Sequence, residues 1–281
     1  MCKDYLGKDY TCLKNKKLYL FDMDGTIYRE NDLFEGVLEF LDIIKKQGGH
    51  YVFITNNASK SVNDYIAKIN KMGITANESN FLTSVQATIL HFNKNYKGQR
   101  VFAQGTKSFI KELKDGGLNV TEEYDESAKI ILVGFDPEVT GDKMRVTSKM
   151  LTQVKDAKYY ATNPDWVCPV DFGYIPDCGS MCFGYEKATG RTPVYIGKPQ
   201  PAMINIAMEK FGFTKEQTLV FGDRLYTDIA SGVNAGVDTV LVLSGEATMK
   251  DYNESEVKSA FVLQEVKDML KLYEIDSNKS I

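Results

Sequence analysis

Short apolar runs alternate with amphipathic segments of helical period along most of the chain. The runs that have the length and character of strands are 18–22, 51–55, 194–196, 218–221, 238–243 and 261–263. The segments whose apolar residues recur at helical spacing are 34–47, 61–72, 201–211, 227–235 and 264–274. This alternation is typical of parallel βαβ units. We therefore predict an α/β fold with a Rossmann-like core, in which a parallel sheet carries helices on both faces.

The middle of the chain has an α/β alternation of its own. Helices are expected at 84–96, 107–113 and 142–155, and strands at 100–103, 129–135 and 158–161. About a hundred residues are enough for a separate small domain. We therefore expect residues 80–180 to form an inserted smaller α/β domain, and residues 1–79 and 181–281 to form the core.

Composition and charge exclude several classes of protein. The 281 residues include 34 Lys plus Arg and 38 Asp plus Glu, a net charge of −4. Because affinity for a phosphate backbone comes mainly from clustered basic side chains, we expect no nucleic-acid partner, while a small anionic substrate stays compatible with a local positive site. The longest apolar runs, such as 130–135 and 239–243, are far shorter than a spanning helix, so we expect no membrane partner.

The N-terminus and the cysteines indicate the compartment. The first 17 residues lack the apolar stretch of a signal peptide, and the five cysteines are scattered along the chain. Such cysteines are typical of reduced thiols, so we expect a cytoplasmic protein. Cys178 and Cys182 are four residues apart, but the chain has two histidines and no second cysteine pair, which disfavours a zinc site.

The segment with the most chemical information follows the first strand. Asp22 and Asp24 end this apolar run and are followed by Gly25 and Thr26. Residues two apart in a strand point to the same side, so both carboxylates could converge on one site and hold a hard cation. A solvated Asp-Gly turn explains the same residues equally well.

Three more apolar runs end in polar residues. The run 51–54 leads to Thr55, Asn56 and Asn57, whose hydroxyl, amides and backbone N–H groups can grip an oxyanion. Each feature has a simpler explanation taken alone, and for Thr55 it is a helix cap. Ligands of parallel sheets bind beyond the carboxyl ends of the strands, so we expect these ends to share one edge.

The other two strand ends supply a cation and further acids. The run 194–197 leads to Lys198, and the run 218–222 leads to Asp223 and then Asp228. The simpler explanations here are a surface lysine and a helix N-cap. Together the four strand ends provide acids, a hydroxyl and an ammonium, which is the inventory that phosphoryl transfer requires.

At this point the chain resembles a known family over residues 16–275. The segments LYLFDMDGTIY, VFITNNAS, TNPD, TGRTPVYIGKPQP and VFGDRLYTDIASGVNAG are similar to those of the haloacid dehalogenase-like superfamily, in its p-nitrophenylphosphatase-like branch. The resemblance implies a large cap domain inserted between the second and third motifs, which agrees with the second α/β alternation. It also implies a Mg²⁺-dependent phosphatase of small phosphomonoesters.

The resemblance assigns the reacting groups. Asp22 would be the nucleophile that forms an aspartyl-phosphate, and Asp24 the general acid that then becomes the base. Thr55, with Asn56 and Asn57 beside it, would hold the phosphoryl oxygens. Lys198 would bind the substrate and neutralise the developing negative charge.

The same resemblance assigns the metal ligands. Mg²⁺ would be bound by the Asp22 carboxylate, the Asp24 backbone carbonyl and Asp223. Asp228 would have a supporting role, in which it orients Lys198 or the waters of the metal. The partner would be a small phosphorylated metabolite, and a homodimer is possible by analogy with the family.

Several alternatives stay open. A phosphotransferase or mutase would use the same intermediate, and a non-catalytic protein would bind a phosphorylated metabolite without turnover. In the TNPD segment, Asn163 or Asp165 could contact the leaving group, although an ordinary Asn-Pro turn is favoured. Trp166 could cover a substrate, although a place in the core of the cap is favoured.

Overall fold

The computed structural model describes residues 2–57, 62–170 and 172–273. The chain divides into two compact units. Unit 1 comprises Met1–Thr55, Lys60–Leu82 and Pro199–Ile281, and unit 2 comprises Asn56–Ser59 and Thr83–Lys198. The expected boundary at residue 180 differs from this division, which places residues 181–198 in unit 2.

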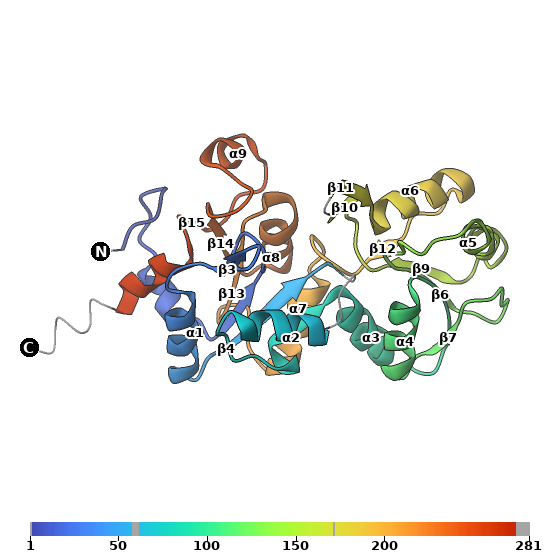
Figure 1. Cartoon of the computed structure of the whole chain (residues 1–281), viewed down its shortest axis with the longest axis horizontal. Helices are drawn as coiled ribbons and strands as arrows, with labels where there is room; N and C mark the ends of the chain where they lie inside the picture. The colour runs from blue at the N-terminus through green and yellow to red at the C-terminus, as the bar shows by residue number, and fades with distance from the viewer. Residues whose placement is uncertain (1, 58–61, 171, 274–281) are drawn as a thin grey trace, which may run out of the picture. The chain divides into compact units, whose positions relative to one another are not determined.

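Unit 1 is built on a six-stranded sheet with the strand order β15-β14-β13-β1-β4-β5. Figure 1 labels β4, β13, β14 and β15 of this sheet. In chain order its strands are β1 (Leu18–Phe21), β4 (His50–Thr55), β5 (Phe81–Thr83), β13 (Thr218–Gly222), β14 (Asp238–Val242) and β15 (Phe261–Leu263). The pairs β1–β4, β1–β13, β13–β14 and β14–β15 are parallel. The strand order reverses at β1, which has β4 on one side and β13 on the other. Ligands bind beyond the carboxyl ends of the strands at such a switch point.

Helices surround this sheet, and a short hairpin follows β1. The helices are α1 (Val37–Lys46), α2 (Val62–Lys71), α7 (Ala202–Phe211), α8 (Ala230–Ala235) and α9 (Met249–Glu254). Shorter turns are the 3₁₀ segments η1 (Thr11–Asn15), η2 (Glu78–Asn80) and η4 (Val266–Leu270) and the π-helical η3 (Leu225–Ile229). The hairpin consists of β2 (Tyr28–Arg29) and β3 (Asp32–Leu33).

Both faces of the unit 1 sheet are packed against helices. On one face, Phe21 and Phe221 stack at 4.8 Å between ring centroids, and Phe40 of α1 packs edge-on against them. On the other face, Leu241 packs with Leu225 of η3. Successive strand residues point to opposite faces, so these two cores follow from the apolar character of the whole strands. The predicted parallel sheet with helices on both faces is confirmed.

Unit 2 has a five-stranded sheet with the order β12-β9-β8-β6-β7, and all its neighbouring strands are parallel. Its strands are β6 (Arg100–Gln104), β7 (Asn119–Thr121), β8 (Ile130–Val133), β9 (Lys158–Ala161) and β12 (Val194–Tyr195). Its helices are α3 (Ser84–Asn95), α4 (Lys107–Asp115), α5 (Gly141–Gln153) and α6 (Cys178–Thr189). An antiparallel hairpin of β10 (Val167–Val170) and β11 (Gly173–Pro176) precedes α6.

One strand lies in a different sheet from the one expected. The sequence placed the run 194–196 in the core, but β12 pairs with β9 of unit 2. Backbone bonds from Ile196 to Ala161 and from Gly197 to Thr162 continue this pairing to the residue before Lys198. The expectation that one sheet edge carries all four polar strand ends is therefore wrong for Lys198.

Other differences concern local structure. Trp166 is 59% exposed, so the prediction of a core position is wrong. The expected helix 227–235 consists of η3 and α8, and within 264–274 the structure has η4, with residue 274 outside the described part. Cys178 and Cys182 are buried with their Sγ atoms 4.0 Å apart, and they belong to the apolar core of unit 2.

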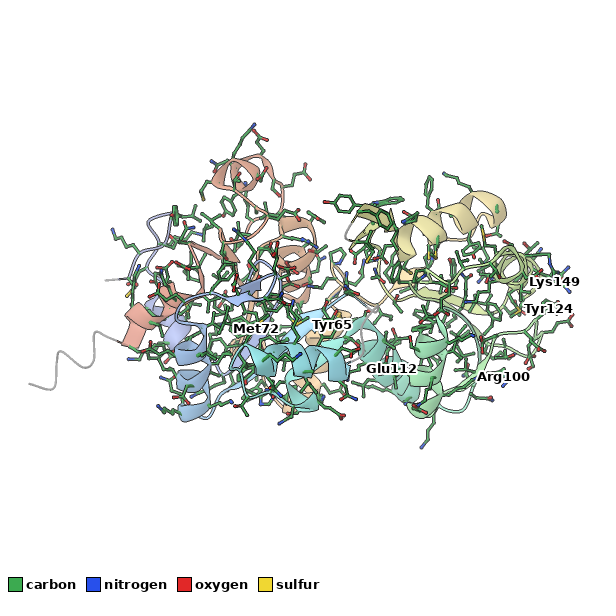
Figure 2. All side chains as sticks on the ribbon, viewed as in Figure 1. Tyr65, Met72, Arg100, Glu112, Tyr124 and Lys149 are labelled. Atoms are coloured by element: carbon green, nitrogen blue, oxygen red, sulfur yellow. The ribbon has the colours of Figure 1, made fainter. Side chains whose placement is uncertain are left out.

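Ion pairs, cation–π contacts and apolar packing stabilise other parts of both units. Figure 2 shows Arg100, Tyr124 and Lys149 in unit 2, where Arg100 pairs with Asp125 at 2.9 Å and Lys149 lies over the Tyr124 ring. Tyr65, also labelled there, packs from α2 into the core of unit 1. Among the described residues, no helix combines the length and apolar character needed to cross a bilayer.

Candidate active site

Three acids from two segments of unit 1 converge beyond the carboxyl end of the sheet. Each of Asp22, Asp223 and Asp228 offers a carboxylate oxygen, and these oxygens lie within 4.8 Å of one another. Asp22 directly follows β1, and its backbone N–H donates to the carbonyl of Phe221 at 2.9 Å. Asp223 directly follows β13, so the pairing of two parallel strands brings the acids together.

Asp223 is a buried acid that one backbone hydrogen bond holds in place. It is 3% exposed, and its Oδ2 accepts a hydrogen bond from the backbone N–H of Glu246 at 2.8 Å. Its Oδ1 is buried and has no hydrogen-bond partner among the residues that the structure describes. Burial, followed by the negative charge of Asp22, raises the pKa of Asp223 to about 6. A buried acid with an unsatisfied oxygen beside a second acid is suited to a cation.

Asp228 reaches the cluster through an unusual helical turn. It lies in the π-helical η3 and is 1% exposed. Its Oδ2 accepts from the backbone N–H of Arg224 at 3.2 Å, and its own carbonyl accepts from the Ser231 hydroxyl at 2.7 Å. π-Helical turns occur frequently at functional sites. The sequence predicted a supporting role for Asp228, and the structure places its carboxylate near those of Asp22 and Asp223.

Three glycines lack the side chains that would otherwise overlap the acids. A Cβ added at Gly245 or at Gly25 would overlap the Asp223 carboxylate, and one added at Gly222 would overlap Asp228. Ser244 beside them donates its hydroxyl to the Gly25 carbonyl at 2.7 Å. The segment 244–246 therefore shapes the site, and the sequence analysis missed it. The glycine that follows the strand 238–243 was the signal that could have found it.

Asp24 does not join the acidic cluster. β1 ends at Phe21, so strand alternation does not extend to residue 24, and Asp24 is exposed. Gly25 has a φ of +79°, which turns the chain. Its N–H donates to the Tyr28 carbonyl at 2.8 Å. Burial and then the charge of Asp24 raise the pKa of Tyr28. The structure therefore does not place the Asp24 carboxylate in the acidic cluster.

Thr55 and its neighbours lie at the next strand end. Thr55 is the last residue of β4, which pairs with β1, and it is 7% exposed. The next residue, Asn56, belongs to unit 2, where it is also buried, and Asn57 is partly buried. Ser84 at the start of α3 donates its hydroxyl to the Asn56 carbonyl at 3.0 Å.

Lys198 is a buried ammonium at the end of the segment that follows β12. It is 4% exposed and belongs to unit 2. Its backbone N–H donates to Asn56 Oδ1 at 2.8 Å, and its backbone carbonyl accepts from Asn56 Nδ2 at 2.9 Å. The structure thus brings together Asp22, Asp223 and Asp228 in unit 1, and Asn56 and Lys198 in unit 2.

Family models match both ends of the chain. A model described as haloacid dehalogenase-like hydrolase matches residues 19–119, and a HAD-hydrolase-like model matches residues 195–269. The chain belongs to the haloacid dehalogenase-like hydrolases. The matched ranges include every acid of the cluster.

Relatives of this hydrolase are phosphatases by name. An acid sugar phosphatase of Staphylococcus haemolyticus is 30% identical over 95% of this chain and 100% of its own length. A 4-nitrophenylphosphatase of Thermotoga maritima is 37% identical, with a TM-score of 0.84 over 92% of this chain and 98% of the other. A glycerol phosphate phosphatase of Mycobacterium tuberculosis in complex with magnesium is 26% identical, with a TM-score of 0.82 over 92% of this chain and 76% of the other. The predicted family branch and enzyme class, phosphoric monoester hydrolase, are confirmed.

The acids of this hydrolase fit a divalent cation. Asp22, Asp223 and Asp228 present hard oxygen ligands, and the buried Oδ1 of Asp223 accepts no hydrogen bond from the described part of the chain. Mg²⁺ takes oxygen ligands and is commonly bound through one or two carboxylates together with water and a substrate phosphate. The donor set therefore agrees with the expected class of ion.

Proposed function

We propose that this hydrolase is a Mg²⁺-dependent phosphatase of small phosphomonoesters that works through an aspartyl-phosphate on Asp22. The observation that carries the proposal is the convergence of the carboxylates of Asp22, Asp223 and Asp228, one of which has a buried oxygen without a hydrogen-bond partner among the described residues. Asp223 and Asp228 would hold the ion together with Asp22. When bound, Mg²⁺ would neutralise negative charge on the phosphoryl group.

The residues of the chain divide the reaction into two steps. A carboxylate oxygen of Asp22 attacks phosphorus, and the bond from phosphorus to the ester oxygen breaks while Asp24 gives its proton to that oxygen. Asp24 then takes a proton from water, which attacks phosphorus and releases inorganic phosphate with Asp22 restored. Thr55 and the loop amides would bind phosphoryl oxygens, and the Lys198 ammonium would offset their charge.

The substrate class is proposed from the names of the relatives. Two of them act on sugar phosphates or glycerol phosphate according to their names. We therefore propose small phosphorylated polyols and sugars as the first compounds to test, with unit 2 acting as the cap that selects among them.

Trapping the intermediate tests the proposal directly. Purified protein is mixed with p-nitrophenyl [³²P]phosphate and Mg²⁺ and quenched in acid. Label should be retained on the protein, be released by hydroxylamine as an acyl phosphate requires, and be absent from Asp22→Asn. Turnover without label on the wild-type protein would refute the covalent step, and transfer of phosphate to added glycerol instead of water would indicate a phosphotransferase.

A further inference from the structure

The Asn56 side chain forms hydrogen bonds with both the backbone N–H and the backbone carbonyl of Lys198. Asn56 Oδ1 accepts from the Lys198 N–H at 2.8 Å, and Asn56 Nδ2 donates to the Lys198 carbonyl at 2.9 Å. Asn56 is 7% exposed and Lys198 is 4% exposed. Because both bonds are shielded from water, they fix the backbone from which the ammonium extends.

The space for this contact depends on the absence of a side chain at Gly197. A Cβ at residue 197 would lie 2.5 Å from Asn56 Oδ1 and 2.6 Å from the Thr162 carbonyl oxygen. The Gly197 N–H donates to that same carbonyl at 2.7 Å. Gly197 therefore lets the asparagine amide lie directly against the backbone of the next residue.

A second acid fixes the orientation of the Asn56 amide. The Asn56 Nδ2 also donates to Asp165 Oδ2 at 3.0 Å. The amide nitrogen thus has two acceptors and the amide oxygen has one N–H donor. A reversed amide would place N–H against the Lys198 N–H and oxygen against a carboxylate, so only one orientation satisfies all three contacts.

The side chain of Asp165 is held by Asn163, another residue of the TNPD segment. Its Oδ2 accepts from Asn163 Nδ2 at 2.9 Å, and Asn163 Nδ2 also donates to Asp177 Oδ1 at 3.1 Å. Asn163 is 1% exposed, and its Oδ1 accepts from the Thr162 hydroxyl at 2.8 Å. These bonds join the side chains of Asn163 and Asp165 to each other and to neighbouring side chains of unit 2.

We propose that Asn56 is a positioning residue for Lys198, and that Asp165 and Asn163 hold Asn56 in its working orientation. The inference rests on the proposed function, because it assigns a purpose to the fixed backbone of the catalytic lysine. A displacement of about 1 Å in a charge-neutralising group can cost about 100-fold in rate. The network fixes the backbone of Lys198, from which the ammonium extends.

A double-mutant cycle separates positioning from a direct or structural role. In Asn56→Asp, one carboxylate oxygen faces the Lys198 carbonyl and Asp165, so we expect kcat on p-nitrophenyl phosphate to fall by about 10- to 100-fold. In a Lys198→Ala background the same change should lower kcat by less than about threefold, because the group that it positions is already gone. Equal losses in both backgrounds would overturn the proposal.

Hydrogen exchange tests the contact without any turnover. In protein labelled with [¹⁵N]lysine, the Lys198 amide is identified by the signal that Lys198→Arg removes. Its exchange should accelerate at least about tenfold in Asn56→Ala and less in Asp165→Ala, because an amide exchanges when its hydrogen bond opens. Unchanged exchange would refute the contact even in an inactive protein, whereas failure of the wild-type protein to hydrolyse any phosphomonoester would refute the proposed function alone.

Asn93 provides the matched control. Its side chain donates to the Gly116 carbonyl at 2.8 Å in the same unit. Asn93→Ala removes a comparable asparagine-to-backbone bond, so it should leave kcat and Lys198 exchange within about twofold of wild type. If Asn56→Ala does not fold by circular dichroism, Asp165→Ala carries the exchange test, and unchanged exchange there then overturns the proposal.

Discussion

Asp223 accepts a hydrogen bond from the backbone N–H of Glu246 through Oδ2, at 2.8 Å, while its buried Oδ1 has no hydrogen-bond partner within residues 2–57, 62–170 and 172–273. The bonded oxygen fixes the side chain, and the other oxygen stays available to a ligand. The charge of Asp22 nearby contributes to the raised pKa of Asp223. A bound cation would offset the repulsion between the two carboxylates and would give the Asp223 Oδ1 a ligand.

Replacing Asp223 with asparagine should therefore weaken metal binding. Asp223→Asn preserves the shape and removes the charge, so the Mg²⁺ concentration that gives half-maximal hydrolysis of p-nitrophenyl phosphate should rise about 10- to 100-fold. Mg²⁺ should also raise the Tm of the wild-type protein and raise that of the variant less. An unchanged Mg²⁺ dependence would remove Asp223 from the metal site.

Adding a side chain at Gly245 should also impair the metal site, because it would displace the Asp223 carboxylate. The new Cβ of Gly245→Ala would overlap the Asp223 carboxylate, which must then move away from its position beside Asp22. We expect kcat to fall by about tenfold or more and the Mg²⁺ requirement to rise. Steady-state rates across a Mg²⁺ series measure both quantities.

Gly184→Ala is the control for Gly245→Ala. Nothing lies within 4 Å of the position that a Cβ would take at Gly184, which is inside α6. Alanine is favoured over glycine within a helix by about 0.5–1 kcal/mol, so this variant should be fully active and slightly more stable. If both variants lose activity alike, the space around Asp223 is not the cause.

The proximity of Asp22 to Asp223 could be predicted from the sequence because it follows from strand pairing. Asp22 and Asp223 each follow an apolar strand, and the pairing of β1 with β13 places the two strand ends side by side. For Lys198 the same reasoning failed, because a two-residue strand pairs with whichever sheet edge is available and its sequence does not specify which. The Asn56 contact was missed because it joins residues 142 positions apart. No local pattern encodes such a pairing.

The only tryptophan offers an optical test of a corrected prediction. Trp166 is 59% exposed and packs edge-on against Phe183, with 5.6 Å between the ring centroids. Its emission maximum should lie close to that of tryptophan in water, and iodide should quench it efficiently. A blue-shifted emission that resists iodide would show that the ring is covered in solution. Phe183→Leu, which removes the neighbouring ring, should leave the emission maximum unchanged.

Asp177 should make the stability of unit 2 fall as the pH rises. Burial raises its pKa to about 6 from an ordinary value of 3.8, so the folded state holds this proton more tightly than the unfolded state. The resulting stabilisation is complete below the unfolded value and is lost as the pH rises through about 6. Two pKa units correspond to about 3 kcal/mol.

Asp177→Asn should remove this dependence while it keeps the local bonds. Asp177 Oδ1 accepts from both the Cys178 N–H and Asn163 Nδ2, and the Oδ1 of an asparagine can accept both. Relative to wild type, the variant should therefore gain about 2–3 kcal/mol of unfolding free energy between about pH 4 and about pH 7.5, measured by urea denaturation. Asp125→Asn should show the opposite trend, because hydrogen bonds from Ser127 and Arg100 lower the pKa of Asp125. A stability difference that does not change with pH in Asp177→Asn would show that Asp177 is ionised as easily in the folded protein as in the unfolded chain.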